Sequence, residues 1–180
     1  MVVVLVSMTT LFTLIAILQA FSISLGTGAS TLAIINFFVA IADGGISPDE
    51  RRMMGVVYIV LRVAMVLILL TTITLLIRQY GIGGLSSMST FHLGQALAIT
   101  VLFVNAVLMT KHMIPSNFGP AIQAGNWYTL GTLSALLPLG IVGFSLTQFI
   151  LAYLAWLILA ISIVNAIMAL QMAKRNKFVK

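Results

Sequence analysis

The sequence predicts an all-α membrane protein, a polytopic helical bundle of six transmembrane helices with a duplicated helical hairpin at its centre. The first observation behind this prediction is composition: 61% of the 180 residues are hydrophobic and only 7% are charged. A soluble domain carries charge on about a quarter of its residues. The second is a series of long apolar stretches separated by turn-forming residues. The third is a charge imbalance, nine Lys and Arg against three acidic residues, placed beside the apolar stretches.

A hydrocarbon core of about 30 Å needs roughly 20 apolar residues for one helical crossing. Six helices are expected on this basis, at 2–24, 29–43, 49–78, 91–113, 119–142 and 146–173. Turn signals separate them: "GTGAS" (26–30), "DGGISPD" (43–49), "YGIGGLSSMST" (80–90), "IPSNFGP" (114–120) and "GFS" (143–145). The first stretch has no basic leader and no clear cleavage site, so it is expected to remain as a helix. The chain is expected to form a single membrane domain over 1–180.

The cations predict an orientation. Most lie in the 43–52 and 111–118 loops and in the C-terminal tail, whereas the opposite side has Arg78 alone. The positive-inside rule then places both termini in the cytoplasm, and the membrane is expected to be a bacterial inner membrane. Nucleic acid is excluded as a partner because no basic patch is interleaved with aromatic residues. Anionic lipid headgroups are the expected partners of Arg51, Arg52, Lys174, Arg175, Lys177 and Lys180.

The third expected helix has a marked start. Ser47 precedes Pro48, and Glu50 completes a capping box. Arg62 follows about 21 Å along the helix axis from Pro48. This depth places a guanidinium near the middle of the membrane.

Two hairpins, 29–78 and 91–142, share a pattern. Asn36 precedes Asp43 by about two helical turns, as Asn105 precedes His112. After the turn, "GVVY" (55–58) parallels "GNWY" (125–128). The pattern predicts a hairpin repeat flanked by helices 2–24 and 146–173. Parallel repeats occur in transporters, although duplication also produces inert scaffolds.

Residues 31–72, with "VLFVNAVLMTKHMIP" and "AGNWYTLGTLSAL" further on, resemble a group of small multi-span bacterial integral membrane proteins. In that group an Asp-Gly-x-Ile-Ser turn precedes a long third helix, and a helix with Asn and a helix with Trp-Tyr follow. The resemblance implies the topology and a bacterial source. It implies no activity, because none is established for the group, and it assigns no functional residue.

Arg62 is the centre of the predicted site. An unpaired guanidinium at the bilayer centre costs about 2.5–3.5 kcal/mol on insertion scales. The three acids, Asp43, Asp49 and Glu50, all lie at the cytoplasmic edge. One interpretation is therefore a polar pocket for an anionic group, with the ligand-binding residues Arg62, Asn36, Asn105, Tyr58 and Tyr128. The alternative is a structural arginine turned toward Asp43 and the lipid headgroups.

Other chemistry is not expected. The absence of cysteine removes disulfides and thiolate sites. His92 and His112 lie about 30 Å apart on one expected helix, so they cannot ligate one haem. The ten methionines form no Met-x-x-Met array that would suggest copper. No metal, no cofactor and no enzymatic activity are predicted.

Two functions remain. The first is a small transporter or channel with the pocket around Arg62, which the deep arginine favours. The second is a non-enzymatic scaffold or accessory subunit of a larger membrane complex. A stripe of small residues on the last helix is compatible with a homo-oligomer: Ala155, Ser162, Ala166, Ala169 and Ala173.

Overall fold

The structure is a computed structural model that describes residues 2–43, 47–115 and 118–178, with side chains described for 8–39, 47–115 and 118–173. Every regular element in these residues is helical, which confirms the all-α class. The elements are five α-helices and one short 3-10 helix: α1 (Val2–Asp43), α2 (Pro48–Gly83), η1 (Gly84–Ser87), α3 (Thr90–Thr110), α4 (Phe118–Leu136) and α5 (Leu146–Phe178).

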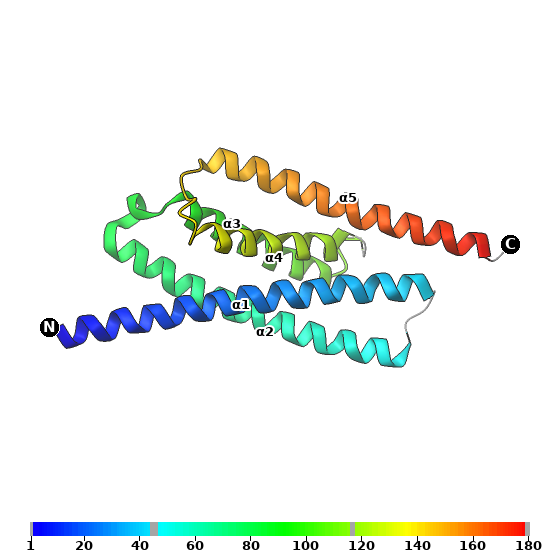
Figure 1. Cartoon of the computed structure of the whole chain (residues 1–180), viewed down its shortest axis with the longest axis horizontal. Helices are drawn as coiled ribbons and strands as arrows, with labels where there is room; N and C mark the ends of the chain where they lie inside the picture. The colour runs from blue at the N-terminus through cyan, green and yellow to red at the C-terminus, as the bar shows by residue number, and fades with distance from the viewer. Residues whose placement is uncertain (1, 44–46, 116–117, 179–180) are drawn as a thin grey trace.

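The five α-helices lie along the long axis of the molecule and alternate in direction (Figure 1). α1 and α2 form one antiparallel hairpin, and α3 and α4 form a second. α4 packs against α1, α3 and α5, so it is the element that joins the two hairpins and the last helix. α1 begins and α5 ends at opposite ends of the long axis (Figure 1).

The first two expected spans are one helix, which corrects the six-span expectation. α1 runs through "GTGAS" without a break and is 42 residues long. Glycine breaks helices in water, but in hydrocarbon the helical backbone bonds have no competing partner. The stretch serves packing instead, because Ser22, Gly26 and Ser30 are buried on one face of α1. With five helices the ends of the chain lie apart, so the expectation of both termini on one side does not follow from this fold.

The expected start of the third helix is confirmed, whereas the helix expected at 119–142 ends earlier, at Leu136. α2 begins at the capping box, in which Ser47 Oγ accepts from the Glu50 backbone N–H (3.3 Å) and Glu50 Oε2 accepts from the Ser47 N–H (2.7 Å). Residues 137–145 are not helical and separate α4 from α5, with Gly140 at φ 70°. Glycine tolerates this left-handed conformation because it has no Cβ.

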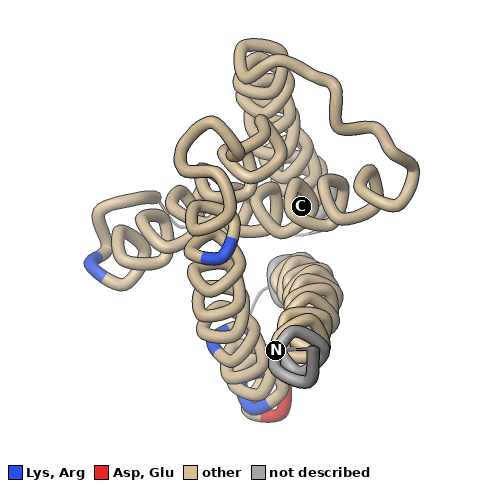
Figure 2. Tube along the Cα trace, turned by 90° about the vertical axis from the view of Figure 1, so that its left-hand side faces the viewer, with Lys and Arg blue, Asp and Glu red and all other residues tan. Residues whose placement is uncertain are grey.

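Four stretches of the described residues are long and apolar enough to cross a membrane: Met8–Val39, Pro48–Ser87, Thr90–Thr110 and Leu146–Ala173. Their outward side chains include large aliphatic residues such as Leu14, Ile77 and Ile158. Few charged residues interrupt the chain trace (Figure 2). An apolar exterior on long apolar helices indicates an integral membrane protein.

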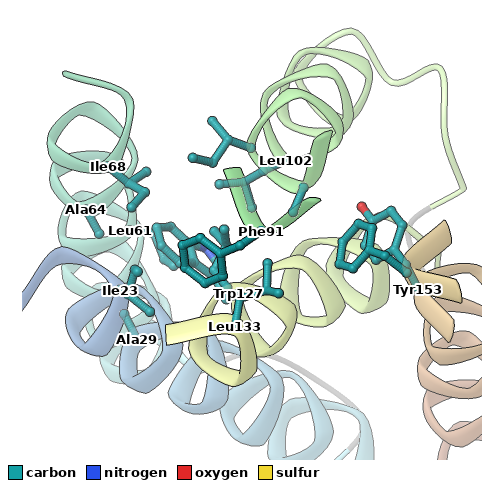
Figure 3. Packing of buried hydrophobic residues seen from close by; sticks show 14 residues of the cluster. Ile23, Ala29, Leu61, Ala64, Ile68, Phe91, Leu102, Trp127, Leu133 and Tyr153 are labelled. Atoms are coloured by element: carbon teal, nitrogen blue, oxygen red, sulfur yellow. The ribbon is translucent and has the colours of Figure 1, made fainter. Parts of the chain in front are cut away.

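The core lies where α1, α2, α3 and α4 meet. Trp127 of α4 is fully buried, with Ile23 of α1, Leu61 of α2 and Leu102 of α3 in the same cluster (Figure 3). Small residues bring the helices close together, as is common in membrane bundles. A Cβ added to Gly26 would lie 2.3 Å from the nearest ring atom of Trp127. α4 therefore packs against α1 through the Trp127 ring, which lies against the α1 backbone at Gly26.

Candidate functional site

Arg62 lies on the outside of α2 and not in a polar pocket inside the bundle, which was one of the two interpretations of the sequence. The buried face of α2 consists of Leu61, Ala64, Ile68, Thr71 and Thr72. Arg62 is about 100° of rotation from Leu61 on the helix, and its side chain is exposed. Among residues whose side chains are described, it has no hydrogen bond or ion pair. The side chain of Asp43, its other expected partner, lies outside the described residues.

Tyr58 shares the exposed side of α2 with Arg62. It is 44% exposed and lies one turn before the arginine. Val66 and Ile73 continue the same side and are also exposed. These four residues, Tyr58, Arg62, Val66 and Ile73, are called the α2 outer face below. The face is apolar except for one phenol and one guanidinium.

Asn105 lies in the interior and contacts a different set of residues. It is 3% exposed on α3, and its Nδ2 donates to the Gly119 carbonyl (2.9 Å) and to Gln123 Oε1 (3.0 Å). Gln123 Nε2 lies 3.5 Å from the sulfur of Met65. Asn105 Oδ1 is buried and has no partner among the described residues. The amide therefore joins α3 to α4, a packing role typical of asparagine in membrane helices.

Tyr128 and Asn36 lie on α4 and α1, so they are not part of the α2 outer face. The hydroxyl of Tyr128 is 2.7 Å from Thr31 Oγ1, and its ring meets Trp156 edge-on. Asn36 is half-buried on α1. The structure does not bring the five predicted residues into one pocket. The paired residues of the expected repeat also differ in environment, since Tyr58 is exposed and Tyr128 is hydrogen-bonded between helices.

A second set of polar contacts joins helices, and sequence reasoning missed those of Tyr153 and Trp156. Tyr153 of α5 donates from its hydroxyl to Oδ1 of the fully buried Asn126 on α4. Trp156 Nε1 donates to the Gly125 carbonyl (2.9 Å), and Gln19 Nε2 donates to Thr72 Oγ1 (2.8 Å). Each is a polar side chain inside an apolar stretch, which is the signal that could have found them. Each such hydrogen bond contributes about 1 kcal/mol or less to the stability of a membrane protein.

The hydrogen bonds of Asn105, Tyr128 and Tyr153 join neighbouring helices. No group of three or more His, Asp or Glu in the described residues could hold a metal ion. His92 Nδ1 lies 2.9 Å from Ser89 Oγ, one turn away at the start of α3. This is a local contact at a helix end, and no acid faces it among the described hydrogen-bond partners. The feature of this chain that most needs a physical explanation is therefore the exposed Arg62 on a membrane-spanning helix.

No protein-family model, no curated protein and no solved structure matches the chain.

Proposed function

We propose that the protein is a non-enzymatic subunit of a larger membrane complex, and that its α2 outer face contacts a second membrane protein. The observation that carries this proposal is the exposed Arg62 in the apolar stretch Pro48–Ser87. Because Arg62 is positively charged, its expected partner is a membrane-embedded carboxylate on the second protein. The protein is proposed to lie in a bacterial inner membrane, in line with its resemblance to small bacterial multi-span proteins.

The energetic argument is the cost of leaving Arg62 in lipid. An arginine at the centre of a membrane helix costs about 2.5–3.5 kcal/mol on insertion scales and more in simulations. Hydrocarbon offers it no acceptor. A carboxylate from a second chain would pair with it and remove most of that cost. Without a partner, the guanidinium must reach back along α2 toward the headgroups near Arg52, since side chains tilt toward the N-terminus of their helix.

The orientation also belongs to the proposal. The end of the molecule with Arg51, Arg52, Lys111 and the basic tail is assigned to the cytoplasm by the positive-inside rule. α1 then begins on the opposite side, while the C-terminal tail stays cytoplasmic. In this orientation Arg51, Arg52 and the tail cations are expected to contact anionic headgroups.

The test is co-purification from native membranes in a mild detergent, with a tag on the full chain. The wild-type protein is expected to retain a second membrane protein in fixed ratio. Arg62→Gln should lose it because the charge is gone, and Arg62→Lys should keep most of it. Arg78→Gln is the matched control, because the Arg78 guanidinium lies 4.4 Å over the Phe12 ring inside this chain. A complex that survives Arg62→Gln unchanged would contradict the proposal.

The first function predicted from sequence gives a different result in the same experiment. A transporter or channel around Arg62, Asn36, Asn105, Tyr58 and Tyr128 would purify as a monomer or homo-oligomer. It would also pass anions when reconstituted in vesicles, and Arg62→Gln would abolish that flux. Such a result would replace the subunit proposal.

A further inference from the structure

A cleft of about 780 Å³ lies between α4 and α5, away from the α2 outer face. One wall runs from Tyr128 to Leu136, and the other from Gln148 to Trp156. Each wall is about 12 Å long at the α-helical rise. Phe144, from the segment that connects the two helices, also lines the cleft. The cleft therefore lies beside the end of α4 and α5 that this segment joins, and its length of about 12 Å is less than the roughly 15 Å of half a hydrocarbon core.

Stacked aromatic rings form much of the α5 wall. The ring of Phe149 stacks on Tyr153 with centroids 5.6 Å apart and planes 9° apart. Its other neighbour is Phe144, 6.2 Å away at 27°. The rings are held in place because Phe149 and Tyr153 are both buried. The wall is a preformed apolar surface.

The polar groups of the walls are already engaged. Trp156 Nε1 donates to the Gly125 carbonyl, and the Tyr153 hydroxyl donates to Asn126. The hydroxyls of Thr129 and Thr132 donate to carbonyls of their own helix at 2.8 and 2.9 Å. The interior of the cleft thus offers rings and methyl groups and few free donors. A polar or charged ligand would lose its hydration there without replacement.

The cleft opens to the outside of the bundle. Thr132, Gln148 and Ala152 line it and are exposed. Because α5 is apolar enough to cross a membrane, this opening faces lipid. Gln148 lies in the first turn of α5, at the end of the cleft near the connecting segment. Its Oε1 accepts from the Ser145 backbone N–H at 2.9 Å, which leaves its amide nitrogen to donate to a carbonyl at the membrane surface.

We propose that the cleft binds one hydrocarbon chain of a membrane lipid, with the lipid's ester carbonyl near Gln148. The volume lies within the range of about 300–1,000 Å³ typical of ligand sites, and the lining is of the apolar and aromatic kind found there. A spanning helix of a second protein is about 30 Å long, so it would contact the cleft over less than half of its length. A flexible hydrocarbon chain from one leaflet matches a cleft of about 12 Å.

The test uses the fluorescence of Trp156, which lines the cleft, against Trp127, which is fully buried in the core. A phospholipid with a brominated acyl chain is titrated into the detergent-solubilised full chain. Quenching is expected to saturate at about one lipid per chain and to vanish in Trp156→Phe. Quenching that grows in proportion to the lipid content of the micelle, without saturation, would overturn the proposal because it reports only surrounding lipid.

Variants that fill the cleft with a larger side chain can be compared with a control variant outside it. Ala152→Phe from α5 and Thr132→Phe from α4 should each weaken the saturable binding by about tenfold, a loss of about 1.4 kcal/mol. Ala155→Phe is the control, because Ala155 is an exposed alanine of the same helix that does not line the cleft. Far-UV circular dichroism and Trp127 emission report whether each variant is folded. Equal binding by all three variants would contradict the site, as would loss of a homo-oligomer on filling the cleft.

Discussion

Gly26→Ala should destabilise the protein, although alanine is the better helix former. The prediction depends on the contact between α1 and α4. A Cβ at residue 26 would lie 2.3, 2.4 and 2.4 Å from three ring atoms of Trp127. Carbon atoms in optimal contact lie about 3.5–4.0 Å apart, so the two helices would have to separate by more than about 1 Å. The Trp127 ring cannot turn aside easily because it is fully buried.

The sign follows from two opposing terms. Replacing glycine by alanine inside a helix favours folding by about 0.8–1.0 kcal/mol in soluble hosts. Overpacking a filled core costs about 1–3 kcal/mol, and occasionally more. A clash with a rigid ring belongs at the upper end of that range. We therefore expect Gly26→Ala to lower the free energy of unfolding by about 1–2 kcal/mol.

Gly28 supplies the matched control two residues along the same helix. A Cβ at Gly28 would have no neighbour within 4 Å, so Gly28→Ala should be neutral or stabilising by up to about 1 kcal/mol. Both variants can be compared by denaturant-induced unfolding in micelles, followed by circular dichroism. Equal stabilities for the two variants would refute the close contact of α1 and α4.

A double-mutant cycle tests the identity of the obstructing group. Trp127→Phe removes the outer ring atoms that the new methyl group would meet. Gly26→Ala should therefore cost less in the Trp127→Phe background than in the wild type, by about 0.5–3 kcal/mol of coupling. Additive effects would show that some other contact sets the cost.

Two further predictions concern topology and the buried hydrogen bond between α4 and α5. The chain has no cysteine, so single cysteines introduced at Ser87 and Asn176 should be labelled from opposite sides of the membrane. An N-terminal tag should be accessible from the same side as Ser87. A tag accessible from the side of Asn176 would contradict the five-helix arrangement. Tyr153→Phe should destabilise the protein by about 1–3 kcal/mol because it leaves the buried Asn126 oxygen unpaired, whereas Tyr80→Phe at an exposed tyrosine should have little effect on the same unfolding curve.

The fold class could be read from the sequence because hydrocarbon imposes strong constraints. Long apolar stretches must be helical to satisfy their backbone groups, and the capping box at Ser47 marked the start of α2. The stretch "GTGAS" misled because its residues form turns in soluble proteins. In this chain the small residues let α1 approach Trp127. The spacing of Ser22, Gly26 and Ser30 at one-turn intervals was the available signal for that packing.

The site could not be read in the same way. A helix that is apolar all round carries no stripe to show which face is buried, so the direction of Arg62 was undetermined by the residues around it. The structure places it outward because Leu61, Ala64 and Ile68 occupy the face toward the other helices. The α4–α5 cleft was also beyond sequence reasoning. It depends on how two helices diverge from their connection at 137–145, which no local pattern encodes.

Contact between the α2 outer face and another protein inside the membrane can be detected by a photo-crosslinking residue at Val66, one turn after Arg62, in native membranes. The control position is Leu154, which is similarly exposed on α5. We expect Val66 to crosslink to one membrane protein and Arg62→Gln to abolish that crosslink, while Leu154 crosslinks to lipid. Crosslinks to lipid alone at both positions would contradict it.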